Sequence, residues 1–103
     1  MGKNSSIKSL GKCIGNVVFH ELLLRHTKIP ESEKHINDEI RDYVFDVEIK
    51  AQEFSWTEEE KSEIEDRAFK RAINRTEKYP DLGYEESEIH DLLSKMMEKL
   101  FLR

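Results

Sequence analysis

The chain has 103 residues, of which 37% are hydrophobic and 38% are charged, and its formal net charge is −5. This length fits one core, so we interpret residues 1–103 as a single helical domain. Only 4 glycines and 2 prolines occur, which is typical of a helix-rich protein and not of a disordered one. A lone cysteine, Cys13, excludes an internal disulfide and favours a cytoplasmic location.

The first predicted helix covers residues 5–27, where apolar side chains recur at helical spacing. Its second half is apolar on nearly every side, so the helix should lie at the centre of a bundle or contact a partner as well as its own core. The apolar stretch is too short to span a bilayer and contains polar residues, which excludes a transmembrane helix. Pro30 ends this helix, because proline disfavours helical geometry in the preceding residue.

The second predicted helix covers residues 30–54 and has the most regular apolar seam of the chain, which ends at Phe54. The segment Thr57–Glu60 reads as a capping box and predicts a third helix over residues 58–77. A turn at residues 80–83 then leads into a fourth helix over residues 84–102. We therefore predict an all-α four-helix bundle with short loops and antiparallel neighbours.

The first interpretation of function is a non-catalytic module that binds another protein or self-associates as a homo-oligomer. It depends on the first helix, which is apolar on nearly every side, and on the wide apolar stripe along the fourth helix, which together offer more apolar surface than a small bundle needs. Two glycines of the first helix are also spaced so that a second helix could approach closely. For the glycines, packing within the core is the alternative. The predicted interface residues are Leu93, Met96, Met97, Leu100, Phe101, Gly11 and Gly15.

The alternative function is a small nucleic-acid-binding regulator. Residues 67–80 contain five basic residues and one acidic residue, whereas residues 29–66 contain four basic and 14 acidic ones. The basic face of the third helix could contact phosphates in a helix-turn-helix arrangement. Its residues are Arg67, Lys70, Arg71, Asn74, Arg75 and Lys78. A purely structural explanation is that basic side chains are favourable near the C-terminal end of a helix and form ion pairs such as Glu63 with Arg67.

The residues do not indicate an enzyme, a metal site or a cofactor. The histidines lack the Glu-x-x-His and His-Glu-x-x-His spacings of metal centres, and whether any has a functional role stays open. They are His20, His26, His35 and His90. Cys13 lies among apolar residues, where a buried, unreactive thiol is expected.

The first residues match a short pattern for attachment of myristate to Gly2. With that modification Lys3, Lys8 and Lys12 would add attraction to acidic lipids. Membrane contact is expected only if Gly2 carries the lipid.

Overall fold

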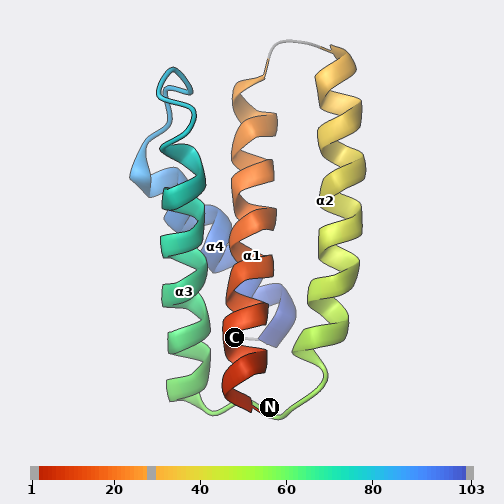
Figure 1. Ribbon diagram of the computed structural model, residues 1–103, viewed down its shortest axis with the longest axis vertical. Helices are drawn as coiled ribbons and strands as arrows, with labels where there is room; N and C mark the ends of the chain where they lie inside the picture. The colour runs from red at the N-terminus through yellow and green to blue at the C-terminus, as the bar shows by residue number, and fades with distance from the viewer. Residues whose placement is uncertain (1–2, 28–29, 102–103) are drawn as a thin grey trace.

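The computed structural model of the chain describes residues 3–27 and 30–101, and regular structure in these ranges is entirely helical. The helices are α1 (Lys3–His26), α2 (Pro30–Ala51), α3 (Glu58–Thr76) and α4 (Glu86–Phe101). They form the predicted all-α four-helix bundle (Figure 1). None of these helices is long and apolar enough to cross a membrane. Gly2 and the predicted end of the last helix at residue 102 lie outside the described residues.

Helix α1 occupies the centre of the bundle, as its all-round apolar character predicts. It contacts each of the other three helices, whereas α2 and α3 do not contact each other. Every residue from Ile14 to His20 is buried, because neighbours cover this stretch on all sides. Among the described residues, the central helix therefore contributes the largest share of the buried apolar side chains. Its exposed charged side chains are Lys8 and Lys12 in its first half and Arg25 in its last turn.

The direction of the helices differs in part from the prediction. Helices α1 and α2 are antiparallel, as predicted for neighbours in sequence (Figure 1). Helix α3 runs in the same direction as α1, because α2 returns the chain to the starting end, and α4 crosses behind them. The most extensive helix pair, α1 with α3, is therefore parallel and not antiparallel.

Two glycines allow the close approach of α1 and α3. A Cβ atom at Gly11 would lie 2.7 Å from the Cβ of Arg67, and one at Gly15 would lie 2.7 Å from the carbonyl oxygen of Ala68. Both distances are shorter than normal van der Waals contact allows. The glycine pair thus forms an internal helix crossing, which is the packing alternative that the sequence left open.

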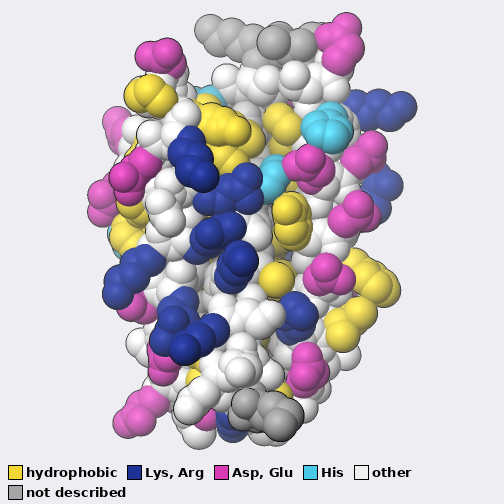
Figure 2. All heavy atoms as spheres, in the orientation of Figure 1, with side chains coloured by type: hydrophobic (Ala, Val, Ile, Leu, Met, Phe, Trp, Pro, Cys, Tyr) yellow, Lys and Arg dark blue, Asp and Glu magenta, His cyan; other side chains and the backbone are white. Residues whose placement is uncertain are grey.

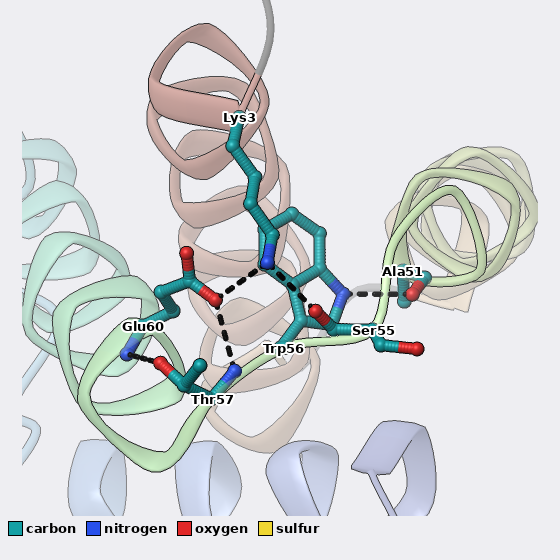
Figure 3. Close-up of polar contacts among 6 residues, drawn as sticks. All are labelled: Lys3, Ala51, Ser55, Trp56, Thr57 and Glu60. Atoms are coloured by element: carbon teal, nitrogen blue, oxygen red, sulfur yellow. Dashed lines mark hydrogen bonds and ion pairs between the residues drawn. The ribbon is translucent and has the colours of Figure 1, made fainter.

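The connection between α2 and α3 explains why α2 ends at Ala51 instead of at Phe54. The indole Nε1 of Trp56 donates a hydrogen bond of 2.8 Å to the carbonyl oxygen of Ala51, one of the terminal carbonyls that the helix itself leaves unpaired (Figure 3). Phe54 lies beyond the helix and packs edge-on against Trp56, with ring centroids 5.4 Å apart. The seam predicted to continue to Phe54 was therefore wrong over its last turn.

The start of α3 confirms the predicted capping box. The amide of Glu60 donates to the Thr57 hydroxyl, and the Glu60 carboxylate accepts from the Thr57 amide at 2.9 Å. Lys3 adds an ion pair of 2.9 Å to the same carboxylate, which ties the first turn of α1 to this cap (Figure 3). The hydrogen bond from Thr57 is the main reason that the pKa of Glu60 lies below its usual range.

The turn before α4 lies where proline and glycine predict it, but the helix begins two residues later than expected. Gly83 has a φ of 71°, a left-handed conformation that favours glycine. Tyr84 stays outside the helix, and its hydroxyl oxygen lies 3.0 Å from that of Thr76 at the end of α3. This contact holds residue 84 in the connection, so α4 starts only at Glu86.

Candidate functional site

The apolar stripe of α4 packs into the core of the chain itself. Leu93, Met96 and Met97 are all buried in the main hydrophobic cluster, and Leu100 and Phe101 pack half-buried against it. The stripe therefore makes its contacts within the chain, as Gly11 and Gly15 do where α1 crosses α3. In this structure the residues predicted to form a protein interface are thus not exposed as one surface.

The basic residues of α3 instead gather on an open surface shared with α1. Figure 2 shows Lys and Arg side chains in a band over these two helices, with acidic side chains along its flanks. One hollow in this band has a volume of about 400 Å³, and we call it the arginine pocket. It is lined by Phe19, Arg71, Asn74, Arg75, Lys78 and Tyr79.

A second hollow of about 310 Å³, the lysine groove, adjoins the arginine pocket and shares Arg71 with it. It is lined by Lys8, Lys12, Arg67, Lys70 and Arg71. The two hollows together are called the basic face below. All six residues predicted for nucleic-acid contact belong to it, and the parallel packing of the helices adds Lys8 and Lys12 from α1.

Asn16 holds the two central arginines of the basic face in place. Its side-chain oxygen accepts a hydrogen bond of 3.1 Å from Nε of Arg71 and another of 3.1 Å from Nη1 of Arg75. Asn16 is itself buried on the central helix, so this anchor cannot move far. Each guanidinium has five N–H donors, so most of the donors of both arginines are left for an external ligand.

The charges of the basic face are neutralised unevenly. Arg67 pairs with Glu63 at 3.0 Å and Lys70 pairs with Asp66 at 3.1 Å, as the i,i+4 spacing predicts. Within the described ranges, no carboxylate forms an ion pair with Arg71, Arg75, Lys78, Lys8 or Lys12. The basic face therefore keeps a net positive charge, and the neutral anchor at Asn16 does not cancel it.

Two aromatic rings complete the arginine pocket. The Arg75 guanidinium carbon lies 4.6 Å from the ring centroid of buried Phe19, a cation–π distance that further orients Arg75. The ring of Tyr79 lies 5.4 Å from that of Phe19, and the residue is 41% exposed. The pocket thus presents cationic donors beside an accessible aromatic surface.

The four histidines each have a partner within the fold. Nδ1 of buried His20 lies 2.7 Å from the carbonyl oxygen of Asn16, and Nε2 lies 2.6 Å from Glu39, which His35 also contacts. His26 lies 2.8 Å from Glu88, and His90 stacks on Phe69 with centroids 4.5 Å apart. Over residues 3–27 and 30–101, no three potential metal ligands come together.

Cys13 is half-buried and packs against the core. Burial raises the pKa of its thiol, so the reactive thiolate is disfavoured at neutral pH. The cysteine was expected to be buried, and the structure places it only half-buried at the edge of the core.

Sequence reasoning missed the residues that convert the basic side of α3 into a pocket. Asn16 and Phe19 lie 50 or more residues away in sequence, and only the register of the parallel helices brings them to Arg71 and Arg75. One signal was present, because Asn16 interrupts an otherwise apolar stretch of the first helix. A buried polar side chain at such a position needs a hydrogen-bond partner.

Comparisons of this chain with protein-family models, with curated proteins and with solved structures find no match.

Proposed function

We propose that this chain is a non-catalytic helical module that binds nucleic acid through its basic face. One observation carries the proposal: Arg71 and Arg75 are fixed side by side on the neutral oxygen of Asn16, with no carboxylate paired to either in the part of the chain that the structure describes. The planar guanidinium group binds phosphate through two parallel N–H donors, and donors that are not paired with a carboxylate are available for this contact. The unpaired lysines at both ends extend this positive surface.

The acidic net charge of −5 does not oppose this proposal at short range. Acidic residues are concentrated in residues 29–66, and the flanks of the basic band are acidic in Figure 2. Charges more than about 10 Å apart are largely screened at physiological salt. A phosphate at the basic face therefore senses the cations of that face more strongly than the carboxylates that lie more than about 10 Å away.

The shape of the basic face disfavours the helix-turn-helix mode of DNA binding that the sequence suggests for the third helix. Such a mode inserts one protruding helix into the major groove, which is about 12 Å wide. Here the cations lie along the seam of two packed helices, each about 10 Å across with its side chains, so the pair is too broad to enter the groove. Arg71 and Arg75 are also tied down to α1 instead of projecting from α3. Contact with the sugar–phosphate backbone is the mode that fits.

The test is the substitution Asn16→Asp, which keeps the size of the side chain but places a carboxylate between the two arginines. We expect the affinity for a mixed-sequence oligonucleotide to fall about ten-fold or more, because the new charge competes with phosphate for both guanidiniums. The control is Asn37→Asp at an exposed position of α2. It changes the net charge by the same amount and lies outside the basic face. Fluorescence anisotropy measures the affinity, and circular dichroism checks the helix content.

Salt dependence gives a second measure of the same contact. If three to five phosphates are bound, the slope of log K against log salt should be about −2 to −4.

If Asn16→Asp disturbs the helices, Lys78→Gln replaces it as the test variant, since this exposed side chain lines the pocket outside α3. Unaltered affinity in both variants, or no binding by the unsubstituted chain at low salt, would refute the proposal.

Self-association is a second candidate function, now through the outer face of α2. Phe45 and Ile49 are 65% and 52% exposed and lie one helical turn apart. Arg41 lies one turn before Phe45 on the same helix, whereas Glu53 lies in the connection after α2. In an antiparallel two-fold pair of α2 helices, the exposed apolar residues of the two copies would lie together and be buried. The solution mass of the chain tests this candidate.

A further inference from the structure

We infer that the arginine pocket holds a single nucleotide of a single-stranded nucleic acid, with the phosphate on Arg71 and Arg75 and the base stacked on Tyr79. This inference rests on the proposed binding of nucleic acid and adds which form of nucleic acid is preferred. It is carried by the exposed ring of Tyr79, which phosphate binding alone does not require.

The phosphate subsite follows from the donors that remain on the two arginines. Arg71 uses Nε and Arg75 uses Nη1 for Asn16, and no further hydrogen bond engages either guanidinium within residues 3–27 and 30–101. Planar guanidiniums can bind phosphate oxygens through two parallel N–H bonds. Because Asn16 holds both groups and Phe19 also contacts Arg75, little side-chain entropy is lost when a phosphate binds.

The base subsite follows from the position of Tyr79 at the wall of the same pocket. One side of its ring packs near Phe19, at a centroid distance of 5.4 Å, while 41% of the residue stays accessible. Stacking of a base on an aromatic ring contributes strongly to single-strand binding and tolerates any base. The exposed side chain of Asn74 also lines the pocket, where its amide can hydrogen-bond the edge of a base.

The dimensions of the site agree with one nucleotide in the pocket and a few more along the groove. A volume of about 400 Å³ lies in the range of small-ligand sites. From Arg67 to Arg75 the axis of α3 rises about 12 Å, far less than one turn of a duplex. In a duplex the bases are stacked inside the helix and cannot reach Tyr79, whereas a single strand can present one.

The experiment compares a single strand of about 12 nucleotides with a duplex of the same length by fluorescence anisotropy. The protein is the full chain, either unsubstituted or as Tyr79→Ala, with Tyr79→Phe as the matched control that keeps the ring. We expect tighter binding of the single strand. Tyr79→Ala should weaken binding of the single strand about five-fold or more, and should weaken binding of the duplex clearly less. Tyr79→Phe, which keeps the ring, should weaken binding of the single strand much less than Tyr79→Ala does.

Two outcomes would overturn the inference, and they separate it from the proposed function. If strand and duplex bind equally, with no effect of Tyr79→Ala but a loss in Asn16→Asp, the single-strand site is refuted while nucleic-acid binding stands. If neither form binds the unsubstituted chain, both proposals fail together. Thermal melting of each variant separates a loss of the fold from a loss of binding.

Discussion

At the scale of single residues, three small or polar positions of α1 determine how α3 packs on it. Gly11 and Gly15 remove the side chains that would keep the helices apart, and Asn16 then reaches the arginines of α3. Gly11 lies beside Arg67 and, one helical turn later on both helices, Gly15 lies beside Arg71. The packing and the basic face thus depend on the same short segment.

Gly15→Ala tests this close packing. Alanine has the higher helix propensity by about 1 kcal/mol, so a position without steric limits would become more stable. Here the added Cβ would lie 2.6 Å from the Cβ of Arg71 and 2.7 Å from the backbone oxygen of Ala68, and backbone cannot move aside easily. We expect a net loss of about 1–3 kcal/mol in the free energy of unfolding, measured with urea.

Gly11→Ala is the matched comparison for that variant. Its nearest backbone atom, the carbonyl oxygen of Ile64, lies at 3.3 Å, so the clash is smaller and the loss should be smaller too. An increase in stability on Gly15→Ala would show that the two helices are not packed as closely as described here.

At the scale of the elements, α2 packs less extensively on the central helix than α3 does. It contacts α1 and, to a small extent, α4, but not α3. Of its three buried apolar side chains in the described residues, Ile36 and Ala51 each keep an exposed fraction of 8%, whereas the three of α3 are fully buried. Because burial of apolar surface is the main stabilising contribution, α2 should separate from the bundle at lower free energy than the other helices.

Native-state hydrogen exchange measures this difference. We expect the amides of α2 to exchange through a partial opening, at a free energy at least about 1 kcal/mol below that of amides in the middle of α1 and α3. The amides around Ile64 and Ala68 of α3 are the internal reference, since both side chains are fully buried against α1. Equal protection in α2 and α3 would instead mean that the bundle opens as one cooperative unit.

At the scale of the whole molecule, charged and apolar surfaces lie on different elements. The basic face belongs to α1 and α3, and the most exposed apolar residues, Phe45 and Ile49, belong to α2. The two candidate functions therefore use separate surfaces. They also respond differently to salt, because phosphate binding weakens steeply as salt rises and an apolar contact does not.

Light scattering on a sizing column, at low and moderate salt, tests self-association. If α2 forms the dimer interface, we expect a mass of twice the chain mass of 12.2 kDa at both salt concentrations. The variant Phe45→Glu should then have the mass of a single chain. The control is Tyr43→Phe on the same helix, which leaves the exposed pair intact. A single chain mass at every concentration would exclude the α2 interface and would leave the proposal for the basic face unaffected.

The sequence by itself determined the number of helices, most of their boundaries and the central place of the first helix. These features depend on local signals, such as apolar spacing, the capping box of Thr57 with Glu60, and the turn before Gly83. The predicted end of the second helix at Phe54 was wrong. The hydrogen bond from the Trp56 side chain to the backbone at the end of α2 is not visible in the spacing of apolar residues.

Only the tertiary structure decided which surfaces are available. The stripe of Leu93, Met96 and Met97 has the same spacing whether it packs inside the chain or against a partner, and periodicity cannot separate the two. Likewise, the basic side of α3 becomes a pocket only because α1 packs parallel to it and brings Asn16 to Arg71 and Arg75. Helices are specified by neighbours in sequence, but a site is assembled from residues that the packing of distant segments brings together.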